Sequence, residues 1–481
     1  MALSMVFGQG SDAVDEDQPL TFRPPLNTLP VSDTNPDAYS SAFAFPVPGS
    51  GIFSTLELPA PGASAEMYRA WGTSAGQYMS LLRTRLVEEA EKMMFRMDLS
   101  ESSLSEESLV GIVCGIISGL GGVENSRAVP VELVVPPLLV LSDSLLERAD
   151  VVQQAVELAT ELTDARANQL DPSRFAEIAA KQAQDHRLGI RVRAGQDLSE
   201  GGFGAISAIG RGSTEHPPVL IELWYPGAHG SVGPNPPEGA VGLAGKGVCF
   251  DSGGLSIKSA EGMYSMHTDC CGAASVLAAM TALDDLQVET PVYAVLPMVE
   301  NLPGPSSVKP GDVITARNGA GVEIIDSDFE GRVVLADAVA LLAESRPAAI
   351  YSFATLTYQI QIALGPDIAG LFARDATAGA RMLRAAERSG EPLWLMPWAT
   401  RYSEQLNSIA PGAQLRNHPL RPSGRAITAA LFIGAFVPET IPFAHVDFAG
   451  PTVTHTPNGP AATGYGVRSI LEVLTNWPGS F

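Results

Sequence analysis

The 481-residue chain has few cysteines and few basic residues. Its four cysteines, Cys114, Cys249, Cys270 and Cys271, are too few for a disulfide framework in a chain of this length, which favours a reducing compartment. Lysines and arginines number 30 against 53 aspartates and glutamates, so the formal charge is −23. Nucleic acids and anionic membranes bind basic surfaces, and this balance therefore argues against both as partners.

The sequence also lacks a long apolar run. The longest, residues 109–122, is too short and too rich in glycine to span a bilayer. No lysine or arginine precedes Arg23, which argues against a secretory signal or a transit peptide at this end. We therefore expect a cytoplasmic protein without a membrane partner.

Hydrophobic residues make up 45% of the chain, enough to build large cores, and its length favours two domains. After residue 186, continuous apolar runs alternate with segments of helical periodicity, which indicates an α/β domain with a mostly parallel central sheet. The predicted strands lie at 219–225, 240–250, 290–299, 348–356 and 443–450, and the predicted helices at 272–286, 333–346 and 426–437.

The organisation predicted from these patterns has three parts. Residues 1–155 form a smaller N-terminal α/β domain with a flexible start, in which 128–142 reads as one or two buried strands and the stretch from 64 to 97 has helical spacing. Residues 156–186 form a helical connector, broken where Asp171 can cap a helix that opens with Pro172. Residues 187–481 form the larger, catalytic domain.

Three segments carry charged side chains at the borders of predicted elements: two of them end predicted strands, and the one with Asp269 begins a predicted helix. Sites in open α/β sheets form at the carboxyl ends of strands, so we expect these side chains to converge. Four carboxylates from three loops, beside lysines, indicate a centre of two hard divalent cations that the carboxylates bridge. The segments are "GKGVCFDSGGLSIKS" with Lys246, Asp251 and Lys258, "MHTDCCGAASVLAAM" with Asp269, and "DSDFEGRVV" with Asp328, Glu330 and Arg332.

Each residue alone has a simpler structural explanation. A single acid in a glycine-rich loop is usually a cap or a turn residue, and a lone lysine is usually solvated. Arg332 could simply open a helix or pair with Asp337. Cys270 and Cys271 follow Asp269, yet packed free thiols are common in cores. His445 lies in a predicted strand, where a core histidine is expected.

The three segments together resemble the signature of the leucyl aminopeptidase family, the M17 metallopeptidases. The family pattern is GKGxxFDSGGxxxK, then MxxD followed by small residues, then [N]TDAEGR. The resemblance extends from about residue 155 to 475 and includes "ENLPGPSSVKPGDV", "ATLTYQIQIALG" and "FAHVDFAGP". This chain departs from the pattern with Asp326 and Phe329 in the third motif and with His267 and the two cysteines around Asp269.

The resemblance implies a role for each matched residue. Asp251 and Glu330 would bridge two divalent metal ions (zinc or manganese, or else cobalt or magnesium). Lys246 and Asp269 would complete one metal site, and Asp328 the other. Lys258 would stabilise the oxyanion, and Arg332 would hold a bicarbonate ion that serves as general base. A lysine binds a metal only when neutral, so Lys246 would need a depressed pKa once the cations are present.

The resemblance also implies a substrate pocket lined by Met266, Thr355, Leu356 and Tyr358. Tyr358 stands where the family has a glycine, so its ring must either fill the pocket or turn aside. The implied function is the removal of N-terminal amino acids, with a leucine-like preference, from peptides by a homohexamer. Two alternatives stay open: a dipeptidase of the Cys-Gly type, and a non-catalytic structural relative.

Overall fold

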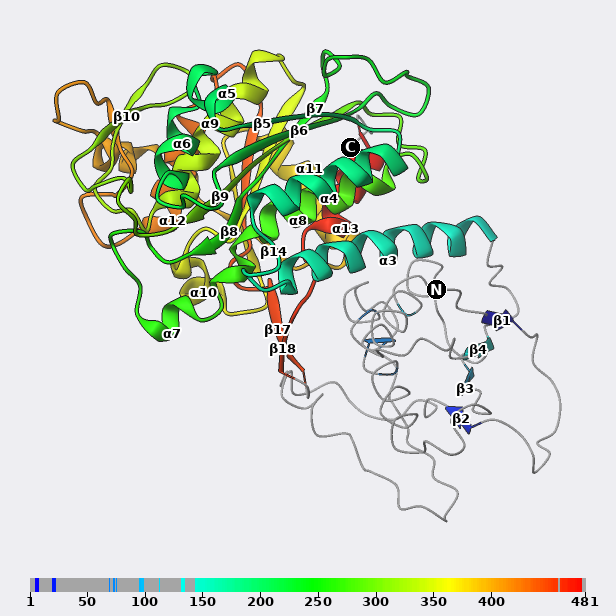
Figure 1. The fold of residues 1–481 in the computed structure, drawn as a ribbon. Coiled ribbons are helices and arrows are strands. Elements are labelled where there is room, and N and C mark those ends of the chain that lie inside the picture. Colours follow the sequence, from blue (N-terminus) through cyan, green and yellow to red (C-terminus); the bar gives the residue numbers. More distant parts are fainter. Residues whose placement is uncertain are drawn as a thin grey trace. The chain divides into compact units, whose positions relative to one another are not determined.

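The computed structural model in Figure 1 describes residues 143–456 and 459–477 and, before them, four short strands and residues 69, 72, 73, 75 and 112. The chain divides into two compact units, Met1–Gln153 and Gln154–Phe481. The predicted α/β class is confirmed. The three-part division of the chain stays a prediction.

Four strands of the first unit form a parallel sheet in the order β1, β4, β3, β2. They are β1 (Met5–Phe7), β2 (Leu20–Phe22), β3 (Phe95–Asp98) and β4 (Val131–Val134). β4 lies within the apolar run that predicted one or two strands. The helical pattern of residues 64–97 falls mostly outside the described residues, and its last three residues belong to β3.

Nine strands of the second unit form one sheet whose centre is parallel. Its order is β14, β13, β16, β12, β7, β9, β6, β5, and β8 also pairs with β9. β16, β12, β7, β9 and β8 run parallel, whereas β13 and β6 run antiparallel to their central neighbours. The strands are β5 (Gly189–Ala194), β6 (Val219–Tyr225), β7 (Val241–Gly245), β8 (Gly247–Asp251), β9 (Val292–Asn301), β12 (Ala349–Ala354), β13 (Ala369–Ala373), β14 (Leu393–Met396) and β16 (Phe443–Asp447).

Helices cover both faces of this sheet (Figure 1). On one face, α8 contacts β7 and β12, and α4 packs on β5, β6 and β9. On the same face, α13 contacts α8 and α11. On the other face, α9 contacts β7, β9 and β12 and packs against α6 and α12. The central strands are consequently buried along their whole length, which explains their mostly apolar sequences. The helices are α3 (Asp143–Asp164), α4 (Pro172–Asp185), α5 (Gln196–Glu200), α6 (Gly204–Gly210), α7 (Ala260–Met263), α8 (Cys271–Ala282), α9 (Glu330–Glu344), α10 (Tyr358–Leu364), α11 (Ala376–Ser389), α12 (Arg425–Gly434), α13 (Val467–Thr475), and the 3₁₀ helices η3 (Met266–Cys270) and η4 (Thr400–Leu406).

Smaller elements complete the second unit. A three-stranded sheet consists of β10 (Val313–Thr315), β11 (Gly321–Glu323) and β15 (Leu415–Arg416), and β17 (Val453–Thr456) pairs with β18 (Gly459–Ala462). The predicted cap of α4 is confirmed, because Asp171 Oδ1 accepts hydrogen bonds from the amides of Ser173 and Arg174 at 2.8 and 3.0 Å. Among the helices in the described part of the chain, none combines the length and the hydropathy that crossing a bilayer requires.

Candidate metal centre and active site

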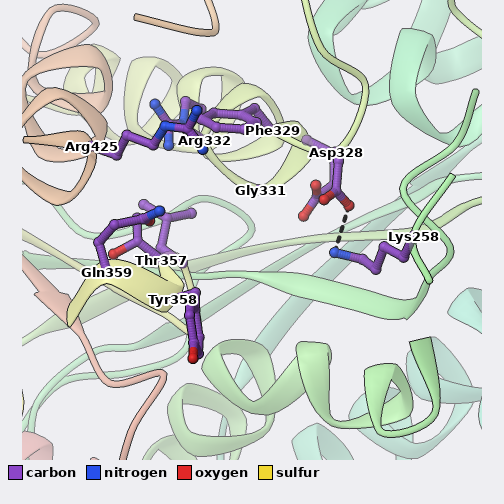
Figure 2. A pocket seen from close by; sticks show the side chains of 11 residues that line it. Lys258, Asp328, Phe329, Gly331, Arg332, Thr357, Tyr358, Gln359 and Arg425 are labelled. Carbon is purple, nitrogen blue, oxygen red and sulfur yellow. Dashed lines mark ion pairs between the residues drawn. The ribbon is translucent and has the colours of Figure 1, made fainter. Parts of the chain in front are cut away.

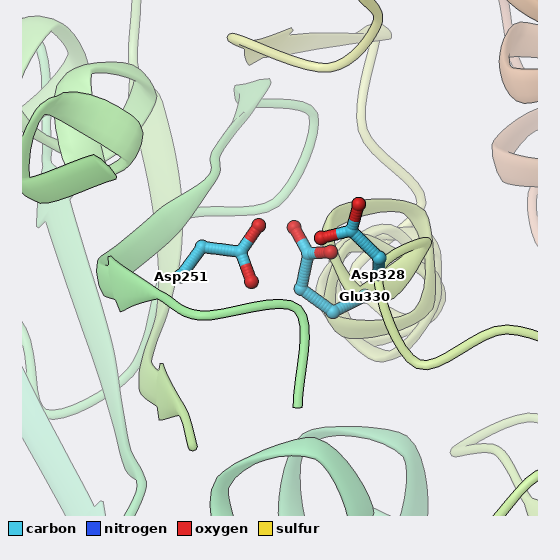
Figure 3. A group of neighbouring side chains, drawn as sticks. All are labelled: Asp251, Asp328 and Glu330. Carbon is cyan, nitrogen blue, oxygen red and sulfur yellow. The ribbon is translucent and has the colours of Figure 1, made fainter. Parts of the chain in front are cut away.

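A strand end, a 3₁₀ helix and the loop before α9 bring the predicted acids to one place. Asp251 is the last residue of β8, Asp269 lies in η3, and Glu330 is the first residue of α9. Asp328 comes two residues before α9, in the loop that follows β11. Figure 3 shows the carboxylates of Asp251, Asp328 and Glu330 turned toward one another, and one oxygen of each lies within 4.8 Å of the others.

The turn after Asp251 requires glycine. Gly253 and Gly254 have φ angles of +84° and +62°, in the left-handed region that favours glycine. A Cβ on Gly253 would lie 2.4 Å from the carbonyl oxygen of Ser256, and one on Gly254 would lie 2.7 Å from Oδ1 of Asn301. The turn brings Lys258 back over the acids, which explains the physical need for the "DSGG" sequence.

Two lysines lie among four carboxylates. Lys246 Nζ lies 2.6 Å from Asp269 Oδ2 and 2.8 Å from Glu330 Oε1. Lys258 Nζ lies 2.8 Å from Asp251 Oδ2 and 2.5 Å from Asp328 Oδ1. Lys246 and three of the acids are buried, and Asp328 is half-buried.

These six groups carry more negative than positive charge. Burial raises the pKa of Asp269 to about 7, helped by Glu330 and Asp251 and opposed by Lys246. Burial likewise raises the pKa of Asp328 to about 7, with Asp251 and Glu330 adding to it against Lys258. Burial lowers the pKa of Lys246, but the carboxylates of Asp269, Glu330 and Asp251 outweigh it, so the net shift is upward. The carboxylates thus hold the lysine as a cation when no metal competes.

The donor set fits divalent metal ions. Oε2 of Glu330 is buried and has neither a hydrogen bond nor an ion pair with any described residue. Two ammonium groups cannot neutralise four carboxylates, whereas two hard divalent cations among them would. Lys246 could become a ligand only by losing its proton, which cations bound in the same cluster would favour.

Residues that were not predicted as metal ligands hold these acids in place. Asn301, at the end of β9, donates from Nδ2 to Asp251 Oδ1 at 2.8 Å and to the carbonyl of Ser327 at 2.9 Å. Thr355 donates to Asp269 Oδ1 at 2.7 Å. Asp326 Oδ1 accepts from the amide of Asp328 at 2.9 Å, which fixes the loop that presents Asp328. Asn301 contacts Asp251 and Ser327, which are far from it in the sequence, so motif spacing gave no role for Asn301.

A second group of unpredicted contacts orders the loop after β12. Asp447, buried at the end of β16, accepts hydrogen bonds from the amides of Leu356 and Thr357 at 3.1 and 3.3 Å and from the Thr357 hydroxyl at 2.6 Å. Burial raises the pKa of Asp447 to about 6, against the effect of these bonds. The sequence "FAHVDFAGP" had signalled this segment but assigned Asp447 no role.

A cavity of about 210 Å³ opens beside the acids. Figure 2 shows Lys258 and Asp328 at one side and Arg332, Phe329 and Arg425 at the other, and the ring of Tyr358 points away from both groups. The Tyr358 side chain is 69% exposed, so the ring turns aside rather than filling the cavity. The lining consists of Lys258, Asp328, Phe329, Glu330, Gly331, Arg332, Leu356, Thr357, Tyr358, Gln359 and Arg425, so of the four predicted pocket residues Leu356 and Tyr358 belong to it, and Met266 and Thr355 lie outside that lining.

Arg332 does not pair with Asp337, the structural alternative suggested by the sequence. Asp337 instead accepts hydrogen bonds from the amides of Ala205, Ile206 and Arg317. The Arg332 guanidinium donates to the carbonyl of Asn417 at 3.2 Å and lies over the Phe329 ring, 4.5 Å from its centroid. Burial lowers the pKa of Arg332 to about 10, although Glu330 and Asp447 act in the other direction.

The neighbouring cysteines and histidines take structural positions. Cys270 and Cys271 are buried free thiols, and burial raises the pKa of Cys271 to about 12. His267 Nε2 lies 3.3 Å from Nη1 of Arg166. His445 is fully buried in β16, with Nδ1 2.8 Å from the Ser352 hydroxyl.

Comparisons with known proteins identify the family to which the chain belongs. Residues 157–471 match the sequence profile of the Cytosol aminopeptidase family, catalytic domain. The chain is 40% identical over 338 residues to the "Probable cytosol aminopeptidase" of Roseiflexus castenholzii, covering 69% of this chain and 67% of that relative. It is 39% identical over 343 residues to the protein of the same name from Nostoc punctiforme, covering 70% and 66%. The chain thus spans about two thirds of the length of these relatives.

Solved structures of the bottromycin maturation enzyme BotP are similar as well. One has a TM-score of 0.75 at 32% identity, covering 88% of this chain and 89% of BotP. Another, in complex with Mn, has a TM-score of 0.77 at 29% identity, covering 98% and 99%.

The fold and the matched profile therefore define a metallopeptidase catalytic domain of the α/β class. The chain belongs to the cytosol aminopeptidase family, the M17 metallopeptidases, as its three motifs predicted. By class it is a metal-dependent aminopeptidase.

Proposed function

We propose that this protein is a two-metal aminopeptidase of the cytoplasm that removes N-terminal amino acids from peptides. The observation that carries the proposal is the cluster of four carboxylates and two lysines beside a cavity, with more negative charge than the lysines offset. Such a cluster is costly to bury unless cations bind it. A bound pair of divalent ions would supply the Lewis acidity that activates water and polarises the scissile carbonyl.

Five residues would hold the metal ions. Asp251 and Glu330, the central acids of the cluster, would bridge them. Lys246 and Asp269 would complete one site, since the Lys246 ammonium contacts both Asp269 and Glu330. Asp328, which is less buried, would complete the other and more exchangeable site.

Two basic residues of the cavity would act on the substrate and the proton. Lys258 reaches both Asp251 and Asp328, so its ammonium could donate to an oxygen that gains negative charge at this place. Arg332 presents a guanidinium to the same cavity and would hold a bicarbonate ion that accepts the proton. A bicarbonate requirement of the purified enzyme would support this assignment.

The finer points of the proposal have unequal support. The structure of BotP with Mn supports manganese as one metal, and zinc, cobalt and magnesium are the others to test. Assembly as a homohexamer and a leucine-like preference rest on the family resemblance, and light scattering and a substrate panel would measure them. A Cys-Gly-type dipeptidase shares the same chemistry and differs only in its pocket.

A panel of aminoacyl-coumarin substrates, assayed with Mn²⁺, Co²⁺ or Zn²⁺, tests the proposal. We expect hydrolysis of at least the leucyl substrate and two metal ions per chain by elemental analysis. Metal bound without hydrolysis of any substrate, dipeptides included, would instead favour a non-catalytic relative. All five proposed ligands and both proposed catalytic residues, Lys258 and Arg332, are present in this chain, which weighs against that outcome.

A further inference from the structure

The cavity has oppositely charged walls. The acids Asp328 and Glu330 line one side together with Lys258, and the other side carries Arg332 and Arg425. Figure 2 shows Arg425 next to Arg332 and Phe329, on the side of the cavity away from Lys258. A ligand with a negative group toward Arg332 and Arg425 would match the second wall.

Arg425 has no anionic partner in the described part of the chain. Its guanidinium makes no hydrogen bond or ion pair with any described residue, and its Nε is buried without an acceptor. Arg374, by contrast, donates to four backbone carbonyls, and Arg317 forms an ion pair with Glu344. A guanidinium offers five N–H donors in a fixed plane, so a partly buried one without acceptors points to an absent ligand.

The surroundings of Arg425 favour an anion there. Arg425 Cζ lies 5.4 Å from the Phe329 ring centroid and Arg332 Cζ lies 4.5 Å from it, so two like charges share one ring. Arg425 is also the first residue of α12, and no side chain caps that helix, whose N-terminus carries partial positive charge. The nearby acid Asp326 is engaged by the amide of Asp328 and forms no ion pair with Arg425 in the described structure.

We propose that Arg425 is a specificity-determining residue that binds a carboxylate of the substrate, and that the preferred substrates are short peptides with a carboxylate near the N-terminal amine. This inference rests on the proposed aminopeptidase function. With the metal ions bound, the unprotonated amine of the substrate would lie at the acids that hold them, and its carboxylate would lie at Arg425. A planar guanidinium matches a carboxylate with two parallel hydrogen bonds.

The size of the cavity limits the distance between the amine and the carboxylate. Its volume of about 210 Å³ is below the roughly 300–1,000 Å³ typical of sites for drug-sized ligands. The carboxylate is therefore close to the amine along the chain. It is either the C-terminus of a dipeptide or the side chain of an N-terminal acidic residue.

Two substrate pairs distinguish these sources. Leu-Gly against Leu-Gly-amide tests the C-terminal carboxylate, and glutamyl against glutaminyl coumarin tests the side chain. The metal-loaded full-length enzyme is compared with Arg425→Met, Arg425→Gln and Arg425→Lys. Arg421→Met is the matched control, because Arg421 is exposed on the same segment and lies outside the cavity lining.

The wild type should prefer the carboxylate-bearing member of one pair, and that pair identifies the source. Arg425→Met and Arg425→Gln should lower the ratio of kcat/KM between the two members by about 10- to 100-fold, the effect expected for a lost hydrogen bond to a charged group. Arg425→Lys should restore part of the ratio, and Arg421→Met should leave it unchanged. The use of two truncating variants guards against misfolding of one.

Other outcomes overturn the inference. A wild type without preference in either pair, or an Arg425 variant that keeps the ratio, would show that no carboxylate is read there. An equal loss on all substrates with an altered bicarbonate dependence would mean that Arg425 instead supports Arg332. If leucyl coumarin is hydrolysed in these cases, the proposed aminopeptidase function is kept and only the role of Arg425 is rejected. If the metal-loaded wild type hydrolyses no substrate, both proposals are rejected.

Discussion

Asn301 donates a hydrogen bond of 2.8 Å from Nδ2 to Oδ1 of Asp251, and the amide of Gly253 donates a second one of 2.9 Å to the same oxygen. The other oxygen, Oδ2, is thereby left facing Lys258 and the centre of the carboxylate cluster. Asn301 comes from β9 and Asp251 from β8, so the pairing of these two strands sets the direction of the carboxylate.

The first prediction follows from this hydrogen bond. Asn301→Ala removes one of two donors that orient Asp251, and such losses around metal ligands typically weaken metal binding by 10- to 100-fold. We expect a dissociation constant for Mn²⁺ raised by about that factor in calorimetric titration. Asn407→Ala, at an exposed position, is the control. An unchanged dissociation constant would show that Gly253 alone suffices to orient Asp251.

A second prediction separates metal ligands from the oxyanion donor. Asp251→Ala or Glu330→Ala should lower the metal content and abolish activity. Lys258→Ala should keep the metals and lower kcat by roughly 10²- to 10³-fold, the loss expected for one oxyanion donor. Elemental analysis beside kinetics measures both effects.

Lys309→Ala serves as the control for this set, because Lys309 is exposed. Loss of metal from the Lys258 variant would contradict the role proposed for that lysine. Retention of both metals in the Asp251 variant would likewise contradict bridging.

The third prediction concerns acid stability and His445. Burial lowers the pKa of His445 to about 3, with Arg332 as a second cause. Its Nδ1 lies 2.8 Å from the Ser352 hydroxyl, and its Nε2 has no hydrogen-bond partner among the described residues. The folded protein therefore keeps this ring neutral where the unfolded chain, with a pKa of about 6.5, binds a proton.

The sign of the effect follows from proton binding. Between pH 6.5 and about 3 the unfolded state binds more protons at this site, so stability falls as the pH falls, by up to about 1.4 kcal/mol per pH unit. His445→Gln should remove this contribution, so urea unfolding at pH 7 and pH 5 should show a shallower dependence than in the wild type. Equal slopes in the two proteins would refute it, and His229→Gln, at an exposed histidine, is the control.

The sequence predicted the parts of the site that depend on local order. Asp251 ends a strand, the glycines after it need positive φ angles, and the acids of the third motif lie just before a helix, so their convergence could be expected from the α/β pattern. The contacts of Asn301, Asp447 and Asn417 could not be predicted in this way. Each joins segments far apart in the chain, and their partners are determined by strand order rather than spacing.

The role of Arg425 could not be predicted from the sequence either. It follows Gly424 and directly precedes the predicted helix 426–437, where the sequence pattern gives an arginine no particular role. Only the packing of α12 against α9 places it beside Phe329 and Arg332. Phe329 was noticed as a departure from the family pattern, but its contact with two guanidinium groups required the structure.

The last prediction concerns Tyr358, which occupies the place of a glycine in the family pattern. A ring that filled the pocket would exclude long side chains, which lose burial worth about 0.8 kcal/mol per CH₂. The side chain is 69% exposed and Figure 2 shows the ring pointing away from the rest of the lining, so it leaves the cavity open. Tyr358→Ala should therefore change the relative kcat/KM for alanyl, leucyl and phenylalanyl coumarins by no more than about threefold, well below the effect expected for burial of a whole side chain. Ile362→Ala, at an equally exposed residue of the same helix that lies outside the cavity lining, is the control. A selective rise for the larger residues in Tyr358→Ala would show that the ring closes over the pocket when substrate binds.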